Sequence, residues 1–421
     1  MHALFASIPQ PGHTAPLLPI ARELTARGHQ VTWCGGREFA DQIRSTGADF
    51  TPLSEAIDHN GRSVDEVFPE RTKLRGIAKL RYDLCAVFIE PIPVQLADLR
   101  RLQPADLIVH DMAFGGAPAF AALGGPPSIS VGIGPMTLAS PHTAPFGLGL
   151  QPGTGAVSRL RNRALQALLD RVILREVHDR QAEVQRSLGL EPTRGLGGLS
   201  PYLHLHNGLA EFEHPRPDLP PQVHFVGALV DPLPSKEVPS WWADVEAADR
   251  PIVHVTQGTV ADTELGDLVL PTLHALADLD VLVVASVGRQ VIEDVPANAR
   301  VAPFLPYDRL LPKLSVMVTN GGFGGVQRAL SHGIPLVVAG VTEDKPEVAA
   351  RIARAGVGVN LRTGKPKPAA IRAAVQRLLE TSEIRSNAQR MAALYRAQDA
   401  AGNSADLIER FHAESRVQSS R

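Results

Sequence analysis

A glycine-rich turn that links a short apolar run to a helical pattern is the segment best suited to bind a ligand. The run Val316 to Val318 predicts a buried strand, and apolar residues at helical spacing after the turn predict a helix that Gly333 would end. The turn consists of Asn320, Gly321, Gly322, Phe323, Gly324 and Gly325. It would bring several backbone N–H groups to a helix N-terminus, where the partial positive charge favours an anion such as a phosphate.

These glycines do not fit two common phosphate-binding motifs. A dinucleotide fingerprint requires a third glycine at its sixth position, and counting from Gly322 that position is Gln327. A Walker A loop requires Lys followed by Ser or Thr, and the turn has neither. A tight packing turn is therefore the alternative interpretation. Phosphate binding is favoured by a second candidate, Thr256 to Thr259 after another predicted strand, where Thr259 can donate to the same anion.

Two polar residues of the first half also follow predicted strands. His13 lies in the turn after the strand at 3–8, and Asp111 ends the apolar strand at 106–111. In the common doubly wound strand order 3-2-1-4-5, strands one and four are neighbours beside the crevice where ligands bind. A carboxylate next to an imidazole fixes its tautomer and stabilises the imidazolium, which suits a general base. The alternative is that His13 only begins a helix and Asp111 only caps a loop.

These residues must be positioned by an alternation of short apolar strands and amphipathic helices. That alternation predicts an α/β fold with two doubly wound parallel sheets. The strands expected in the first half span 3–8, 30–34, 48–51 and 106–111, and those in the second half span 252–256, 281–285, 300–302, 316–319 and 336–339.

A proline-rich stretch divides the chain. Prolines occur at 215, 217, 220, 221, 232, 234 and 239, and proline disfavours helices and central strands. We therefore expect a first domain at 1–214, a linker at 215–239, a second domain at 240–395, and a terminal helix at 396–421 that returns toward the first domain.

Bulk composition narrows the function classes. The 421 residues exceed what one core usually holds, and a formal net charge of −2 argues against nucleic acid as the main partner. The only two cysteines, Cys34 and Cys85, lack the spacing of a zinc site or a disulfide framework. We expect no bound metal, no membrane span, no secretory signal and a cytoplasmic location.

The residues described so far resemble those of the family 1 GT-B glycosyltransferases, an inverting group that uses nucleotide sugars and includes bacterial macrolide and natural-product enzymes. The donor signature of that family is similar to Phe304-Leu305-Pro306-Tyr307, followed by the turn at 320–325 and an acidic pair. The resemblance implies that Phe304 stacks on the nucleobase and that the Leu305 backbone bonds its edge. It also implies that Gly12-His13 carries the catalytic base and that Asp111 is its partner.

Three positions depart from the family pattern. Asn320 replaces a histidine and Gly325 replaces a serine, so the helix N-terminus has to stabilise more of the diphosphate charge. The pair that usually reads Asp-Gln, and that binds sugar hydroxyls, is Asp344-Lys345 here, preceded by Glu343. Asp344 can still accept from the sugar. Lys345 can pair with a phosphate or favour another sugar; the alternative is a solvated residue at a helix start.

The resemblance implies a two-domain enzyme with the acceptor on the first domain and the donor on the second, facing each other across a cleft. The donor would be UDP-glucose or a TDP-deoxysugar. Loops at 55–93 and 135–158 contain apolar residues that suit a hydrophobic acceptor such as a polyketide, macrolide or aromatic natural product. Two other functions remain open: a nucleotide-sugar epimerase of the same fold, and a non-catalytic auxiliary sugar-nucleotide binder. A monomer and a homodimer are both compatible with the sequence.

Overall fold

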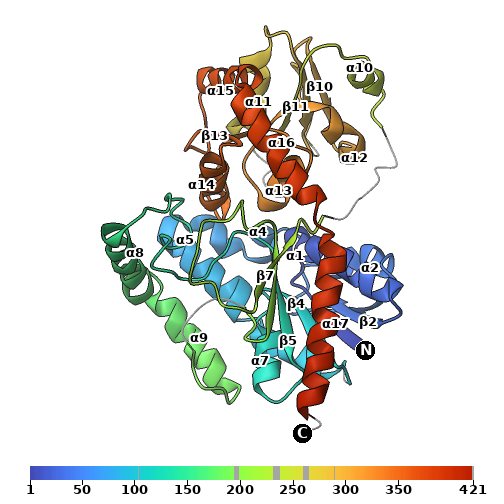
Figure 1. Ribbon diagram of the computed structural model, residues 1–421, viewed down its shortest axis with the longest axis vertical. Helices are drawn as coiled ribbons and strands as arrows, with labels where there is room; N and C mark the ends of the chain where they lie inside the picture. The colour runs from blue at the N-terminus through green and yellow to red at the C-terminus, as the bar shows by residue number, and fades with distance from the viewer. Residues whose placement is uncertain (103, 194–198, 231–237, 259–264, 289, 420–421) are drawn as a thin grey trace.

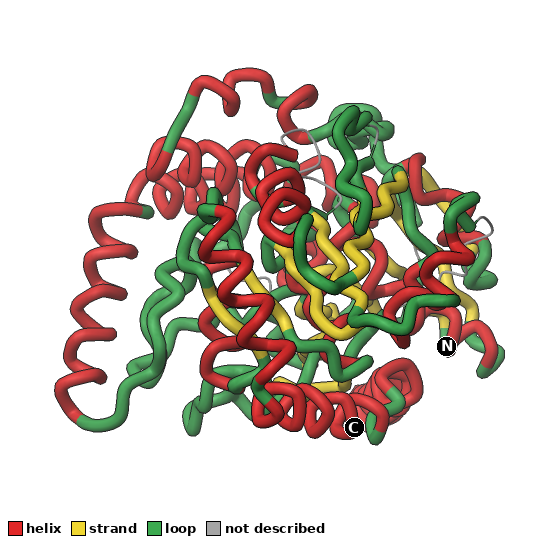
Figure 2. Tube along the Cα trace, turned by 90° about the horizontal axis from the view of Figure 1, so that it is seen from above, coloured by secondary structure: helices red, strands yellow, loops and turns green. Residues whose placement is uncertain are grey.

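A computed structural model describes the whole chain apart from residues 103, 194–198, 231–237, 259–264, 289 and 420–421. It contains two α/β domains stacked along the long axis of the molecule (Figure 1). Seen along that axis, the strands lie inside and the helices and loops surround them (Figure 2).

The first domain is built on a seven-stranded parallel sheet with the order β3-β2-β1-β4-β5-β6-β7. Every residue of β4, β5 and β6 is buried, as expected for parallel strands that are covered by helices on both faces. The strands are β1 (His2–Ala6), β2 (Gln30–Gly35), β3 (Asp49–Pro52), β4 (Leu107–Asp111), β5 (Ser128–Gly132), β6 (Leu203–Asn207) and β7 (Val223–Gly227).

The second domain has a six-stranded parallel sheet with the order β10-β9-β8-β11-β12-β13. In each sheet the strand order changes direction beside the first strand, between β1 and β4 and between β8 and β11, so the predicted doubly wound GT-B fold class is confirmed. The strands are β8 (Ile252–Thr256), β9 (Leu282–Ser286), β10 (Ala299–Ala302), β11 (Leu314–Thr319), β12 (Leu336–Val338) and β13 (Gly358–Asn360).

Helices cover both sheets. In the first domain they are α1 (Pro11–Thr14), α2 (Leu18–Ala26), α3 (Ala40–Arg44), α4 (Val64–Val67), α5 (Gly76–Asp83), α6 (Ile92–Arg100), α7 (Gly116–Ala122), α8 (Ala156–Leu168) and α9 (Arg175–Ser187). The remaining helices are α10 (Trp242–Glu246), α11 (Val269–Leu276), α12 (Tyr307–Leu310), α13 (Phe323–Ser331), α14 (Lys345–Ala355), α15 (Pro368–Glu380), α16 (Ser382–Arg396) and α17 (Ala400–Ser419).

Two segments differ from the sequence prediction. The expected linker at 215–239 contains β7, which pairs with β6 at the edge of the first sheet, so part of that segment belongs to the first domain. An edge position explains why neighbouring prolines are tolerated there. The expected loop at 55–93 contains α4, α5 and a π-helical turn at Leu84–Ile89.

Helix α16 packs on the second domain, and helix α17, which follows it, packs on the first domain (Figure 1). Ala405 and Ile408 are fully buried in the core that lies against β1 and α2. Around that core, His29 Nε2 lies 2.6 Å from Glu409 Oε1 and Arg27 Nη1 lies 2.9 Å from Glu409 Oε2. Helix α17 is therefore part of the first domain's packing.

Candidate active site

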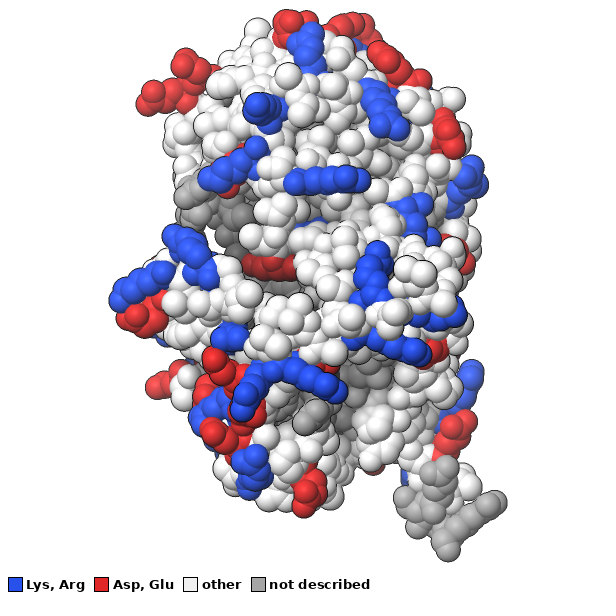
Figure 3. Space-filling view, turned by 90° about the vertical axis from the view of Figure 1, so that its left-hand side faces the viewer, with Lys and Arg blue, Asp and Glu red and all other residues white. Residues whose placement is uncertain are grey.

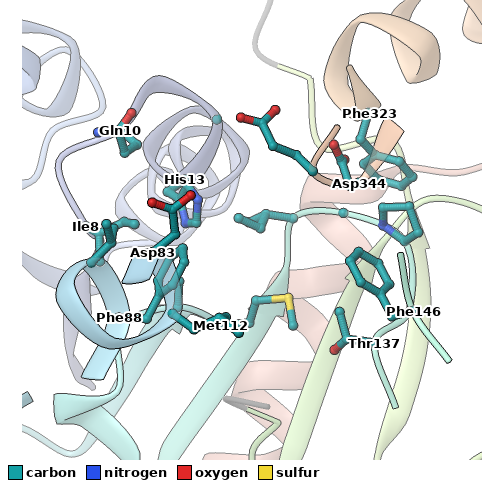
Figure 4. Close-up of a pocket in the computed structure, with 18 of the residues that line it drawn as sticks. Ile8, Gln10, His13, Asp83, Phe88, Met112, Thr137, Phe146, Phe323 and Asp344 are labelled. Atoms are coloured by element: carbon teal, nitrogen blue, oxygen red, sulfur yellow. The ribbon is translucent and has the colours of Figure 1, made fainter. Parts of the chain in front are cut away.

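A cavity of about 3280 Å³ separates the two domains and is lined by the carboxyl ends of both sheets. The face of the molecule that holds α5 and α8 is hollowed between the domains, and charges of both signs are interspersed around the hollow (Figure 3). In close-up, His13, Asp83 and Phe88 lie on one side of the cavity, and Phe146, Phe323 and Asp344 lie on the other (Figure 4). Strand-end crevices of this kind are where α/β folds bind ligands.

His13 and Asp111 are brought together at the ends of neighbouring strands. His13 lies in the short helix α1, and its Nδ1 is 2.8 Å from Oδ1 of Asp111 at the end of β4. Asp111 is fully buried, and its oxygens also accept from the backbone N–H of Ala113 at 2.7 Å and of Ile8 at 2.8 Å. Three donors thus hold the carboxylate. The arrangement leaves Nε2 of His13 as the ring nitrogen that can take a proton in the cavity.

The glycine-rich turn leads from β11 into α13. Gly321 has a φ of +91°, and a Cβ at this position would lie 2.7 Å from a methyl group of Val338, so glycine is required for conformation and for space. A Cβ on Gly324 or Gly325 would meet nothing within 4 Å, because both residues face the open cavity. The first helical turn therefore exposes its backbone to a ligand.

Only part of the turn offers its amides. The N–H of Gly321 donates to the Thr319 hydroxyl at 3.2 Å, and the N–H of Gly322 donates to Oδ1 of Asn320 at 3.4 Å. Among the described residues of the turn, the first-turn amides of Phe323, Gly324 and Gly325 are therefore the ones available to an anion, fewer than the five expected.

Asn320 ties the turn to the neighbouring strand. Its Nδ2 donates to the backbone carbonyl of Gln257 after β8, so one of its two amide hydrogens is already used within the protein. The expected contribution of Thr259 lies outside the described residues. Thr256, which precedes it, shares a 2.9 Å hydrogen bond with the Ser286 hydroxyl.

Phe304 and Leu305 have opposite environments. The Phe304 side chain lines the cavity although the residue is 77% exposed, which is unusual for a large apolar residue and leaves its ring free to stack on a flat ligand. Leu305 is buried in a small core beside Trp242. The adjacent Tyr307 hydroxyl lies 2.9 Å from Nε2 of the buried His254, so Tyr307 anchors this segment to β8.

The acidic segment 343–345 reaches the cavity at the start of α14. Glu343 has a φ of +57°, a conformation that costs energy for a residue with a side chain and that occurs at functional sites. Asp344 is the N-cap residue of α14. Burial raises the pKa of Asp344 to about 6, Glu343 adds to this rise, and the charges of Lys345 and His13 oppose it. His13 therefore acts electrostatically on Asp344 from the opposite wall of the cavity.

Lys345 does not occupy the solvated position that was the alternative expectation. It is only 8% exposed, and its ammonium forms an ion pair with Glu343. Its aliphatic stem packs so closely on Gly340 that a Cβ added to that glycine would lie 2.9 Å from it. A buried lysine needs such a partner because an isolated charge is costly away from water.

Other polar residues of the site were missed by sequence reasoning. Asp83 faces the cavity from α5 and accepts from Arg71 Nε at 2.7 Å (Figure 4). Glu213, Glu347 and Arg351 form a buried cluster where the domains meet. The helical spacing of Glu347 and Arg351 is visible in the sequence, but no local signal connects them to Glu213.

Two further findings concern metals and membranes. Within the described part of the chain, no group of three or more His, Cys, Asp or Glu side chains is arranged to hold a metal ion. None of the described helices combines the length and apolar character needed to span a bilayer.

Comparison with known proteins gives the same result at three levels. Residues 270–408 match the family described as "Erythromycin biosynthesis protein CIII-like, C-terminal domain". The chain is 41% identical to 4'-demethylrebeccamycin synthase of Lentzea aerocolonigenes over 416 residues, which cover 96% of this chain and 98% of that protein. It is 33% identical to UDP-glycosyltransferase 2 of Phaeomoniella chlamydospora, over 98% of this chain and 96% of the relative.

Solved structures share the fold at low sequence identity. The glycotransferase of kitacinnamycin superposes with a TM-score of 0.74 at 22% identity, covering 97% of this chain and 98% of that one. Glycosyltransferase VinC in complex with DTDP superposes with a TM-score of 0.68 at 21% identity, covering 98% and 100%. Because the fold agrees along both domains and the sequence relationship spans nearly the whole chain, the protein belongs to the family 1 GT-B glycosyltransferases.

Proposed function

We propose that the protein transfers a sugar, with inversion, from a nucleoside-diphosphate sugar to a hydroxyl group of a hydrophobic small molecule. The observation that carries this proposal is the His13–Asp111 pair, which faces Asp344 and the glycine-rich turn across the cavity. A base on one wall and an anion-binding turn on the other suit attack on one face of the sugar and departure of a diphosphate from the opposite face.

The reaction would proceed in one displacement. His13 Nε2 accepts the acceptor's hydroxyl proton as that oxygen bonds to the anomeric carbon, while the bond from this carbon to the diphosphate oxygen breaks. The proton stays on the imidazole, whose positive charge is stabilised by Asp111 at 2.8 Å. The leaving diphosphate takes the electron pair, and its charge is stabilised by the N–H groups of Phe323 to Gly325 and by the remaining amide hydrogen of Asn320.

Donor recognition follows from the same wall of the cavity. The exposed Phe304 ring is placed to stack on a nucleobase, and the backbone of Leu305 borders it. Asp344 can accept a hydrogen bond from a sugar hydroxyl, and Glu343 lies beside it. The Lys345–Glu343 ion pair favours a role for Lys345 in supporting this segment over direct phosphate binding. The relatives named above include a UDP-glycosyltransferase and a DTDP complex, so UDP-glucose and TDP-sugars are the donors to test first.

The acceptor would occupy the first domain. Phe88 and Met112 lie on the His13 side of the cavity, and Phe146 lies opposite, beside Asp344 (Figure 4). Leu80, Leu84 and Val87 also line the cavity, from α5 and the π-helical turn that follows it. This apolar wall suits an aromatic or polyketide aglycone that presents a single hydroxyl to the base. The bacterial cytoplasm is the location that we propose for this reaction.

The test is a donor and acceptor panel read by mass spectrometry. UDP-glucose and TDP-deoxysugars are each combined with aromatic, polyketide and macrolide acceptors, and both diphosphate release and the mass of the glycoside are scored. Transfer that is lost in His13→Ala while nucleotide binding is kept supports the proposal. Epimerisation of the donor without an acceptor, or activity that appears only with a second protein, contradicts it.

A further inference from the structure

A buried ion-pair cluster joins the two domains beside the cavity. Arg351 on α14 donates from Nε to Oε1 of Glu213 at 2.8 Å, and Glu213 belongs to the segment between β6 and β7 of the first domain. Arg351 also donates from Nη1 to Oε2 of Glu347, one helical turn away, at 2.9 Å. All three residues are at least 95% buried. One guanidinium therefore bridges carboxylates of both domains.

The outer oxygens of these carboxylates hold a loop of the first domain. Glu213 Oε2 accepts from the N–H of Met136 at 3.0 Å, and Glu347 Oε1 accepts from Gly147 at 3.0 Å and from Gly149 at 2.8 Å. Beyond them, the side chain of Gln151 donates to the Ala350 carbonyl at 2.6 Å. The loop 135–151 is thus fastened at both ends, and much of its fastening comes from the second domain.

The docked loop approaches α14 very closely. Gly149 has a φ of +59°, and a Cβ on it would lie 2.7 Å from the Pro346 carbonyl oxygen. Only glycine permits this approach. The contact is local and uncharged, so it is an independent way to perturb the same docking.

The same loop forms a wall of the cavity. Phe146, next to the fastened Gly147, lies on the same side of the cavity as Asp344, the N-cap residue of α14 (Figure 4). Pro135, Thr137 and Leu138 also line the cavity from this loop. Helix α14 therefore presents Asp344 at its start and holds a wall of the acceptor pocket along its side.

The charges of the cluster stabilise it only while the two domains hold its members together. Burial raises the pKa of Glu213, but the charge and hydrogen bonds of Arg351 outweigh burial and bring it to about 2, so this carboxylate is ionised. Burial lowers the pKa of the neighbouring His206 to about 4, so His206 is neutral at pH 7. Removing one member of the cluster leaves a buried charge without its partner.

We infer that Glu347 and Arg351 of the second domain are positioning residues for the acceptor: with Glu213, they dock the loop 135–151 and so shape the acceptor pocket of the first domain. This inference rests on the proposed function. Its consequence is that acceptor affinity depends on residues of the donor-binding domain that do not face the donor.

The experiment compares Glu347→Gln, Gly149→Ala and the double variant with wild type. Hydrogen exchange of the loop amides at 147–151 is measured in the protein without ligands, and transfer kinetics are measured with UDP-glucose and the best acceptor of the panel. We expect faster loop exchange and an acceptor KM raised by about tenfold. In Glu347→Gln the amide has only one oxygen, so its NH₂ group must face either the glycine amides or the Arg351 guanidinium, and one of these loses its acceptor. The affinity for UDP should stay within about twofold of wild type.

Two controls separate positioning from general damage. Glu383→Gln changes an exposed glutamate of α16 away from the cavity and should leave all readouts unchanged. The double variant should lose less than the product of the two single effects, because both substitutions release the same loop.

Each outcome decides a separate point. Unchanged loop exchange in Glu347→Gln overturns the inference whatever the reaction is. Faster exchange with an unchanged acceptor KM also overturns it and leaves the glycosyltransferase function intact. If wild type transfers no sugar to any acceptor, the proposed function fails, and the inference about the acceptor falls with it.

Discussion

Replacing Asp111 by asparagine separates a catalytic pair from a structural one. The carboxylate accepts three hydrogen bonds: Oδ1 receives His13 Nδ1 and Ala113 N, and Oδ2 receives Ile8 N. Asparagine has one oxygen, so its NH₂ group must face a donor. If the amide oxygen takes the Oδ1 position, it accepts from both His13 and Ala113, whereas in the Oδ2 position it would accept from Ile8 alone. We therefore expect His13 to keep its tautomer and the Ile8 N–H to lose its acceptor.

Two magnitudes follow from this geometry. A buried donor without an acceptor should lower the free energy of unfolding by about 1–3 kcal/mol. The hydrogen bond to the imidazolium changes from charged to neutral, which weakens it by about 1–1.5 kcal/mol and lowers kcat by roughly tenfold. Removing the base itself in His13→Ala should cost about 10² to 10⁴ in kcat.

The assay is diphosphate release under saturating donor and acceptor, together with thermal unfolding, for both single variants and the double variant. Because Asp111 acts on the reaction through His13, the double variant should have the kcat of His13→Ala alone, while it keeps the stability loss of Asp111→Asn. A full extra tenfold loss in the double variant would refute the reasoning, and so would an Asp111→Asn enzyme with the kcat of wild type.

Four further predictions concern the donor wall. Phe304→Ala should weaken UDP binding by about 1–3 kcal/mol in calorimetry, while Phe304→Trp retains it, and equal affinities would exclude stacking. Gly324→Val should lower the affinity for UDP much more than that for uridine, without loss of thermal stability, because its side chain enters the cavity. Burial raises the pKa of Asp344 from its ordinary value of 3.8 to about 6, so the folded protein loses stability as the pH rises from 3.8 to about 6. Asp344→Asn should therefore raise the free energy of unfolding by about 1–3 kcal/mol at pH 7 but change it little near pH 4, as measured in denaturant titrations. Excess EDTA should leave kcat unchanged, since backbone amides stabilise the diphosphate; a loss restored by Mg²⁺ would contradict this.

Much of the fold could be predicted because its signals are local. Short apolar strands alternating with helices indicate parallel sheets, and strand order then placed His13 beside Asp111. The glycines at 321–325 indicated an exposed helix start. Two predictions were wrong for reasons that are also local. The prolines around β7 led to the prediction of a linker where there is an edge strand, and the aromatic and charged residues of 55–93 led to the prediction of a loop where there are helices.

The remaining parts depend on contacts across long stretches of chain. Glu213 meets Arg351 only because the two domains face each other, and neither residue lies in a motif. Lys345 is helix-initial in the sequence, and its burial depends on how the strand ends around Gly340 and Gly321 approach it. Burial of this kind arises from tertiary packing, which periodicity does not report.

The position of helix α17 has a consequence for synthesis of the protein. Its buried Ile408 completes the core beneath β1, although the last strand of that sheet ends at Gly227. At a ribosomal rate of about 5–20 residues per second, this face of the first sheet stays uncovered for roughly 10–35 s after that strand has been made. The second domain should then finish folding first, and shortening the C-terminus should expose the N-terminal domain to aggregation.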